Sequence, residues 1–473
     1  MATPPSHDTK TWPESVAIEF RAQRGIALPL IAMNLTWFAK LAVTTAFLGR
    51  LGDLQLAAGT LGFSFANVTG FAVLTGLCNA MDPICGQAHG ASNAKLLRKT
   101  LLMATILLLA ASIPIAFLWL HVDAVLRRFG QQPDITANAR TYVVCLLPDL
   151  AVTSFLSPLK SYLSAQGITL PTLFSSALAL ALHVPLTMWM ARTKGIQGVA
   201  SAVWISDLAV AVMLAAYVLA SERLRKAAAG GWLEQTTGDW LRLLRLAVPS
   251  CLNTCLEWWC YEILVLLTGR LPDARRMVGV MAVTLNFDYL LFAGMLSLSV
   301  SASVRVSNEL GAGEAGAARR AGMVSIVGGA VGGVAGGVAM VALRRPWGCI
   351  YSGEAGVREG VSSAMKVMAV LEVVNFPLNV CGGIVRGTAR PAVGMYAVLG
   401  GFYVVALPVA VALAFKARLG IDGLLLGFLL GAALSLAVLL TVIARMDWAA
   451  EADKARRRVH ATATTTAATG DAC

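Results

Sequence analysis

An acidic side chain interrupts one of the apolar segments of this sequence. Residues 248–268 form an apolar run with Glu257 near its middle, and roughly 20 such residues are enough to cross a bilayer. A charge at that depth is costly unless a cavity, a partner or a proton compensates it. On a helix, Asn253 and Tyr261 share the face of Glu257, because each lies four residues away. We interpret Glu257 as a functional acid; the alternative is a structural acid hydrogen-bonded to a neighbouring helix. Glu262 lies nearer the helix end and is left open between the two roles.

A second acid with amide neighbours occurs in residues 361–382. Glu372 lies near the centre of this segment, and Asn375 and Asn379 follow on the same helix face. Two carboxylates at membrane depth, each with an asparagine on its own face, indicate a cation or proton site. Such a carboxylate could bind a proton on one side of the membrane and release it on the other.

Other apolar segments also carry polar residues. Asn286 and Asp288, in the segment 277–302, are predicted to join the same polar cluster. The residues predicted to line a substrate cavity are Asn253, Tyr261, Asn286, Asp288, Asn375 and Asn379. Earlier in the chain lie Lys40, Asp149, His183 and Asp207, for each of which a structural role is favoured over a direct one. Lys40 could pair with an acid, and a lone histidine is more often packed and hydrogen-bonded than a proton carrier.

The composition of the whole chain sets the class of protein. The 473 residues are 57% hydrophobic and 14% charged, whereas a soluble domain carries roughly 25% charge. These values predict an all-α polytopic membrane protein. The net charge of +12 does not indicate nucleic acid, because the basic residues lie in short loops between apolar spans, where they orient the chain. The nine cysteines include no C-x-x-C pair, so no zinc site or disulfide framework is predicted.

The sequence contains no motif that predicts enzyme activity. There is no Walker A sequence, no His-rich box and no obvious Ser/His pair among the five histidines. The run Gly311-Ala-Gly313-Glu-Ala-Gly316 follows an apolar span rather than a strand, so it fails the context test for dinucleotide binding. We therefore expect no enzyme activity, no cofactor and no metal.

Hydropathy predicts twelve membrane spans. They cover approximately residues 26–48, 56–80, 99–121, 139–163, 169–190, 197–220, 241–268, 277–302, 321–343, 361–382, 393–415 and 421–444. An even number of spans puts both termini on one side of the membrane. Lys and Arg are more numerous on that side, which predicts that both termini are cytoplasmic.

An internal repeat divides these spans into two sets of six. Its matched pairs, in the same order in both halves, are Leu28-Pro29 with Val248-Pro249, Gly49–Asp53 with Gly269–Asp273, Pro158-Leu159 with Pro377-Leu378, Gln166–Pro171 with Arg386–Pro391, and Gly195–Gly198 with Gly420–Gly423. Because six is even, the halves share one orientation across the membrane. Parallel repeats of this kind are typical of alternating-access carriers with a site between or within the halves.

The repeat also sets the predicted domain boundaries. They are a cytoplasmic N-terminal segment at 1–25, a first lobe at 26–220, a cytoplasmic linker at 221–240, a second lobe at 241–444 and a disordered cytoplasmic tail at 445–473. The first segment lacks the apolar core of a signal peptide, so we expect the first span to direct membrane insertion.

Two segments at equivalent places in the halves carry a family resemblance. Met81-Asp-Pro-Ile-Cys-Gly-Gln-Ala-His-Gly-Ala91 follows the second span, and Arg305-Val-Ser-Asn-Glu-Leu-Gly-Ala-Gly313 follows the eighth. They closely resemble the paired signatures of the multidrug and toxic compound extrusion (MATE) family, which in its plant members, the DETOXIFICATION proteins, read roughly CGQAxGA and RVSNELGAG. The run Cys255-Leu-Glu257-Trp-Trp259 is similar to a CLEWW sequence in a plant subgroup.

This resemblance implies two six-helix lobes around an outward-opening cleft, and antiport of a cation against a substrate. It also implies that the coupling acids lie in the second lobe, a role that falls on Glu257 and Glu372 here. Many bacterial members use an aspartate in the first helix. This sequence has Asn34 and Lys40 there and no acid in that span, which favours coupling in the second lobe.

The predicted function is a secondary active antiporter that exports organic solutes or xenobiotics in exchange for protons by alternating access. A lipid-type flippase of related fold and a Na⁺-coupled exporter are the alternatives. The expected partners are membrane lipid, a small organic substrate and protons, and the chain is expected to act as a monomer. The expected location is the plasma membrane or an endomembrane such as the vacuole or endosome.

Overall fold

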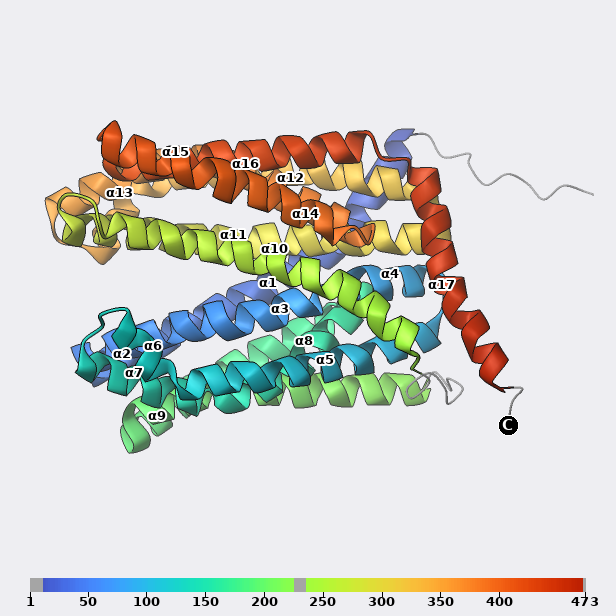
Figure 1. Ribbon diagram of the computed structural model, residues 1–473, viewed down its shortest axis with the longest axis horizontal. Coiled ribbons are helices and arrows are strands. Elements are labelled where there is room, and N and C mark those ends of the chain that lie inside the picture. Colours follow the sequence, from blue (N-terminus) through green and yellow to red (C-terminus); the bar gives the residue numbers. More distant parts are fainter. Residues whose placement is uncertain (1–11, 225–234, 471–473) are drawn as a thin grey trace, which may run out of the picture.

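The computed structural model describes residues 12–224 and 235–470, and helices account for nearly all of them (Figure 1). The first half comprises α1 (Trp12–Leu51), α2 (Asp53–Ala66), the π-helical turn η1 (Asn67–Phe71), α3 (Ala72–Cys78), α4 (Met81–Gly90), α5 (Ala94–Leu120), α6 (Val122–Arg128), α7 (Pro133–Cys145), α8 (Leu147–Ala165) and α9 (Leu170–Leu224). The second comprises α10 (Thr237–Thr268), α11 (Ala274–Ala312), α12 (Ala315–Tyr351), α13 (Ala355–Gly387), α14 (Pro391–Val398), η2 (Leu399–Ala406), α15 (Leu407–Val411), η3 (Ala412–Lys416) and α16 (Gly420–Ala444), followed by α17 (Trp448–Gly470).

These helices account for the twelve predicted spans. Within the described ranges, nine helices are long and apolar enough to cross a membrane, or ten when the bent pair α7 and α8 is taken as one span. One of the nine is α9, whose helical geometry breaks at Gly195, so its 55 residues make two crossings. The twelfth is α10, whose polar and charged residues lower its hydropathy and which runs alongside α11 (Figure 1).

Two hydrophobic cores divide the bundle into two lobes. One core is built from buried residues between Leu48 and Val218, together with Val459 of α17. The other is built from residues between Cys260 and Ala455. Figure 1 shows α10–α16 in the upper lobe and α1–α9 in the lower, with α17 lying across one end of both. The all-helical, two-lobed prediction is confirmed.

The internal repeat reappears in the backbone. Gly195 and Gly420 both have a positive φ, of 58° and 57°, and each stands where two spans of its own lobe join. The partner glycines of the motif allow close packing: a Cβ on Gly198 would lie 2.0 Å from the Met190 carbonyl oxygen, and one on Gly423 would lie 2.7 Å from the Leu413 carbonyl carbon. The same pair of glycines, one with a positive φ and one at a close contact, therefore lets the chain turn between two spans in both halves.

The terminal segments differ from their predictions. The first helix begins at Trp12 rather than near residue 26, because Glu19 and Gln23 are buried against the second lobe. The tail was predicted to be disordered, but residues 448–470 form α17. Its buried Ala452, Ala455 and Val459 recur at helical spacing. This apolar stripe is short, and the charged and Thr-rich residues around it led to the prediction of disorder. The predicted linker at 221–240 lies partly outside the described residues.

The two family signatures are helical, and they pack against each other. They form α4 and the end of α11. A Cβ on Gly86 would lie 1.8 Å from Ser307 Oγ, and one on Gly90 would lie 1.9 Å from the Asn308 carbonyl oxygen. In return, a Cβ on Gly311 would lie 2.1 Å from the Gln87 carbonyl oxygen. The signature glycines thus allow the two lobes to meet backbone to backbone.

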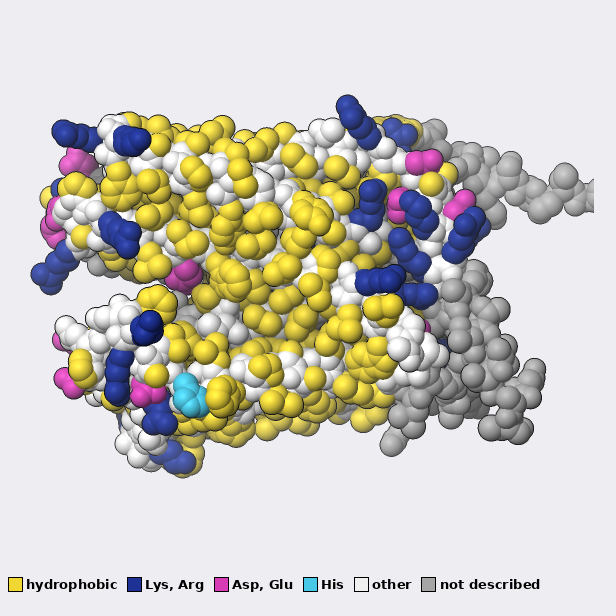
Figure 2. All heavy atoms as spheres, in the orientation of Figure 1, with side chains coloured by type: hydrophobic (Ala, Val, Ile, Leu, Met, Phe, Trp, Pro, Cys, Tyr) yellow, Lys and Arg dark blue, Asp and Glu magenta, His cyan; other side chains and the backbone are white. Residues whose placement is uncertain are grey.

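The surface separates charge from apolar area. Figure 2 shows a broad hydrophobic band around the middle of the bundle, with Lys and Arg gathered at its two ends. At the end opposite α17 the lobes part, leaving a notch between them (Figure 2). This pattern fits a bundle that crosses a bilayer and opens between its lobes on one side.

Candidate functional site

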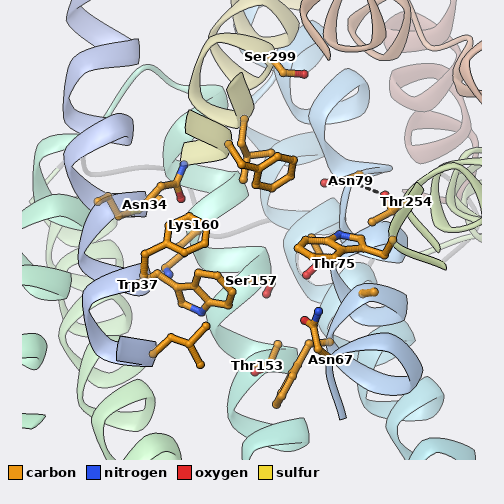
Figure 3. A pocket seen from close by; sticks show the side chains of 18 of the residues that line it. Asn34, Trp37, Asn67, Thr75, Asn79, Thr153, Ser157, Lys160, Thr254 and Ser299 are labelled. Atoms are coloured by element: carbon orange, nitrogen blue, oxygen red, sulfur yellow. Dashed lines mark hydrogen bonds between the residues drawn. The ribbon is translucent and has the colours of Figure 1, made fainter. Parts of the chain in front are cut away.

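A cavity of about 390 Å³ lies between the two lobes. The first lobe contributes side chains from α1, α2, η1, α3, α8 and α9, and the second from α10, α11, α13, α14, η2 and α16. Figure 3 shows the polar side chains that project into it, among them Asn34 and Trp37 of α1 and Thr153, Ser157 and Lys160 of α8. Its walls combine aromatic rings with hydroxyl, amide and charged groups, a lining suited to an organic molecule with polar substituents.

Glu257 of α10 lines this cavity. Its helix neighbour Asn253 also lines it, and the buried Asn253 Oδ1 accepts no hydrogen bond from a described residue. Trp258 extends the same wall and packs edge-on against Phe292, with ring centroids 5.6 Å apart. The helix therefore presents an acid, an amide and an aromatic ring to the space between the lobes.

Glu372 of α13 lies behind the cavity wall. Its side chain is completely buried, and so is that of Asp288 on α11, the helix that packs against α13. Both Glu372 oxygens and Asp288 Oδ1 lack a donor among the described residues, and neither acid forms an ion pair there. A carboxylate buried at this depth without a cation is costly, so the two acids are candidates for groups that take up a proton.

Helix α12 seals this acid pair from the outside. A Cβ on Gly333 would lie 2.8 Å from the Glu372 carbonyl oxygen, and one on Gly337 would lie 2.7 Å from that of Ala369. Gly332 and Gly336 of α12 also allow close packing, against Phe376 and Leu291, whereas Gly328 has nothing within 4 Å. The backbones of α12 and α13 therefore lie in close contact along the turns that carry Ala369 and Glu372.

Amide and phenol groups join the acids to the cavity. Asn375 Nδ2 donates to Tyr261 Oη at 3.4 Å, so α13 and α10 meet beside Glu372. Asn379, one turn further along α13, donates to the Asn375 carbonyl oxygen at 3.1 Å and lines the cavity. Of the six predicted cavity residues, Asn253 and Asn379 line it, while Tyr261, Asp288 and Asn375 lie in the layer behind.

Asn286 does not belong to this site. Its side chain is exposed, and it is not among the cavity-lining residues. The reason is rotation along α11: two helical residues separate it from the buried Asp288 by about 200°, so the two side chains point in opposite directions.

The polar residues of the first lobe are largely paired. Lys40 Nζ contacts both carboxylate oxygens of Asp207 at 2.6 Å, in agreement with the predicted ion pair. His183 is completely buried between Ser206, at 2.8 Å, and Thr44, at 3.1 Å. Asp149 is also buried, with Oδ1 lacking a donor among the described residues. The favoured structural reading of His183 agrees with this packing.

Sequence reasoning missed two cations of the cavity. Lys160 of α8 lines it and forms no ion pair with a described residue. The signal was weak, since Lys160 lies near the end of the predicted span 139–163, which it shares with Asp149. Arg386 of α13 also lines the cavity and forms an ion pair with Asp82 of α4 at 2.9 Å. That pair joins the lobes and could not be read from residues 304 positions apart.

The described residues contain no group of three or more His, Cys, Asp or Glu side chains arranged to hold a metal ion. The acids of the second lobe are too few and too enclosed to form a multidentate cage. What the arrangement offers is a layer of buried acids next to a cavity lined by polar and aromatic groups.

Comparison with known proteins agrees with this geometry. The family model MatE matches residues 29–189 and 249–412. Protein DETOXIFICATION 56 of Arabidopsis thaliana is 53% identical over 451 residues, covering 95% of this chain and 92% of the relative, and DETOXIFICATION 51 of the same plant is 38% identical over 436 residues, covering 91% and 81%. The crystal structure of the eukaryotic MATE transporter AtDTX14 superposes with a TM-score of 0.88 at 29% identity, covering 94% of this chain and all of that one. A Vibrio cholerae MATE transporter, VcmN, shares the fold, with a TM-score of 0.82 at 18% identity over 92% of this chain and 99% of its own.

Proposed function

The chain belongs to the MATE family of membrane transporters, and we propose that it exports organic solutes from the cytoplasm in exchange for protons by alternating access. The family and the multi-pass fold are the premise. The direction of transport, the coupling ion and the roles of individual residues are the proposal. In this scheme protons and a small organic solute are the only species moved, and the protein carries out no chemical step on the solute.

The buried carboxyl pair of Glu372 and Asp288 is the observation that carries proton coupling. No described cation neutralises it, so the two groups share at least one proton or repel each other strongly. Glu257 borders both the cavity and this layer. We assign Glu257 the first contact with protons entering from the cavity, and Glu372 with Asp288 the site where a proton is held.

Proton binding and solute binding would then exclude each other. With Glu257 ionised, the cavity can hold a solute against its acid, its amides and the ring of Trp258. Protonation of Glu257 and of the buried pair removes negative charge and alters the packing of α10 against α13, which releases the solute. Release of the protons to the cytoplasm resets the site.

Alternating access would use the contacts between the lobes. At the α17 end the lobes are joined by the ion pair of Asp82 with Arg386 and by the hydrogen bond from Gln87 Nε2 to the Gly387 carbonyl oxygen, at 3.3 Å. At the opposite end they part (Figure 2). We propose that these contacts break when the cavity opens to the other side, with both termini and α17 in the cytoplasm.

The test is uptake of a fluorescent organic cation into inside-out vesicles, driven by an imposed pH gradient. Wild type is compared with Glu257→Gln and Glu372→Gln, and with Glu359→Gln as a matched control, since Glu359 is an exposed acid on the same helix as Glu372. The proposal predicts uptake by wild type and the control, and uptake no greater than that of empty vesicles for the other two. Normal uptake by both Glu257→Gln and Glu372→Gln, at equal membrane levels, would overturn it.

The same vesicles separate the alternatives. A Na⁺-coupled exporter would respond to a Na⁺ gradient at constant pH and not to the pH gradient. A flippase would move a labelled lipid between leaflets. Lys160 in the cavity is the feature that favours this last possibility, because a lipid phosphate would need a cation there.

A further inference from the structure

The first-lobe wall of the central cavity carries a polar stripe along α8. Asp149, Thr153, Ser157 and Lys160 all line the cavity, and their spacing of four, four and three residues puts them on one helix face. Figure 3 shows Thr153, Ser157 and Lys160 projecting into the cavity. The proposed transport cycle gives a role to none of these side chains.

Three side chains of the stripe are left without a partner in the part of the chain that the structure describes. No hydrogen bond or ion pair joins Thr153, Ser157 or Lys160 to another described residue. Asp149 lies eleven residues before Lys160, which is about 16 Å of helix rise. All three unpartnered side chains are half-buried, so an ammonium group and two hydroxyls are available to a molecule in the cavity. An ammonium group shielded from bulk water is stabilised by an anionic partner.

The other cations of the cavity are already engaged by acids. Lys40 Nζ contacts both carboxylate oxygens of Asp207 at 2.6 Å. Arg386 Nε lies 2.9 Å from Asp82 Oδ2. Among the described residues that line the cavity, Lys160 is therefore the cation whose charge is left to a ligand.

Aromatic rings from both lobes share the cavity with this stripe. In the first lobe Trp37 packs edge-on against Phe38, with ring centroids 4.9 Å apart, and in the second Trp258 packs against Phe292 at 5.6 Å. All four rings line the cavity, as does Glu257, which precedes Trp258 on α10. The cavity therefore offers an unpaired cation in one lobe, an acid in the other and aromatic surfaces in both.

We propose that Lys160, with the hydroxyls of Ser157 and Thr153, binds an acidic group of the transported solute, such as a carboxylate. The solute is then an amphoteric aromatic molecule, whose basic group faces Glu257. Hydrogen bonds from an ammonium group to a carboxylate are about twice as strong as those between neutral groups, so Lys160 selects acidic solutes over their neutral esters. This inference rests on the proposed function, because it names the class of solute for the same site.

The experiment compares two fluorescent dyes that differ in one group. Tetramethylrhodamine ethyl ester is an organic cation, and tetramethylrhodamine is the same cation with a free carboxylate. Binding of each dye to the full-length protein in detergent is measured by fluorescence anisotropy at neutral pH, so the result does not depend on proton coupling. The variants are Lys160→Gln and the charge-conserving Lys160→Arg. The matched control is Lys194→Gln, which removes an exposed lysine of the first lobe outside the cavity wall.

Wild type should bind the acid more tightly than the ester. Lys160→Gln should reduce this preference by about tenfold or more, as expected for the loss of one charge-assisted hydrogen bond. Lys160→Arg should keep most of the preference and Lys194→Gln all of it. Equal affinity of wild type for the two dyes, or an unchanged preference in Lys160→Gln, overturns the inference.

Two further measurements separate this inference from its neighbours. A lipid phosphate presents the same chemistry to Lys160, so a short-chain phosphatidic acid and benzoate are compared as competitors of the acid dye. Displacement by the phosphatidic acid at the lower concentration would assign Lys160 to a lipid and overturn the inference. Uptake of both dyes is also measured in inside-out vesicles. If the pH gradient drives neither dye while the binding preference holds, the proposed proton coupling fails and the acidic-group site stands.

Discussion

The two lobes share one fold but pair their acids differently: Asp207 of the first lobe has a cation partner, whereas Asp149 of that lobe, like Glu372 and Asp288 of the second, forms no ion pair with a described residue. In the first lobe, Lys40 and Asp207 neutralise each other at 2.6 Å. In the second, Glu372 and Asp288 lie together with no described cation to pair with. A balanced pair can stay buried through a whole transport cycle, whereas acids without a cation are suited to take up and give back protons. Under the proposed function, the first-lobe pair is structural and coupling belongs to the second lobe.

The internal repeat allows the two lobes to be compared residue by residue. With Pro29 aligned to Pro249, Glu257 corresponds to Trp37, and with Pro158 aligned to Pro377, Glu372 corresponds to Thr153. Trp37 and Thr153 both line the central cavity. Glu257 lines the cavity as Trp37 does, whereas Glu372 lies behind the wall to which Thr153 contributes, and only the second half has acids at these positions.

The largest expected effect comes from breaking the balanced pair. Lys40→Met leaves the Asp207 carboxylate without its partner, which costs at full burial about 3–5 kcal/mol, and the low end of that range applies because the pair borders the cavity. Thermal unfolding in detergent should show a Tm several degrees lower. The double variant Lys40→Met/Asp207→Asn should regain most of that loss, and a double variant as unstable as the single would contradict the pairing account.

A smaller effect on stability is expected from adding a methyl group where α12 packs tightly against α13. Gly333→Ala places a methyl group 2.8 Å from the Glu372 carbonyl oxygen, and such overpacking costs typically about 1–3 kcal/mol. Gly328→Ala, which meets nothing within 4 Å, is the matched control. Equal Tm values for the two variants would show that α12 does not pack against α13 as described.

A change of about 1 kcal/mol is expected at His183. Replacement by Gln keeps an amide that can reach Ser206 and Thr44, so stability should fall slightly and gradient-driven uptake should persist. The pH profile of uptake, measured between about pH 5 and 8 where histidine titrates, should match that of wild type. A shifted profile would make His183 part of proton coupling and weaken the contrast between the lobes.

The smallest effect on stability is expected at Glu372 itself. Glu372→Gln removes a carboxyl group that has no counter-charge and supplies an amide that can donate to Asp288. Its Tm should equal or exceed that of wild type even though coupled transport is lost. A large fall in Tm would mean that Glu372 stabilises the fold, which is the structural alternative to a role in transport.

Much of the fold could be predicted because each span carries its own signal. Hydropathy located the spans and the repeat grouped them, since both depend on local sequence. The extension of α1 to Trp12 and the helix α17 were missed, because their stability comes from contacts of Glu19, Gln23 and Val459 with distant helices. Helix propensity and amino-acid composition do not reveal such contacts between residues far apart in the sequence.

The site was predicted in part for the same reason. Rotation along one helix placed Glu257 with Asn253, and Glu372 with Asn375 and Asn379, correctly on shared faces. The position of α11 relative to α13 is a tertiary property, so the partnership of Asp288 with Glu372 and the exposure of Asn286 could not be separated in advance. Lys160 was overlooked because it lies close to the end of its predicted span at residue 163, where a long side chain can reach the membrane interface.

The most direct test of the contrast between the lobes is proton release from liposomes reconstituted with the transporter and loaded with a pH-sensitive dye. Substrate added outside should make wild type and Lys40→Met/Asp207→Asn move protons against it, while Glu257→Gln and Glu372→Gln should move none, although all four still bind the substrate. Proton movement by the two second-lobe variants, together with its loss in the first-lobe double variant, would contradict the account and place coupling in the first lobe.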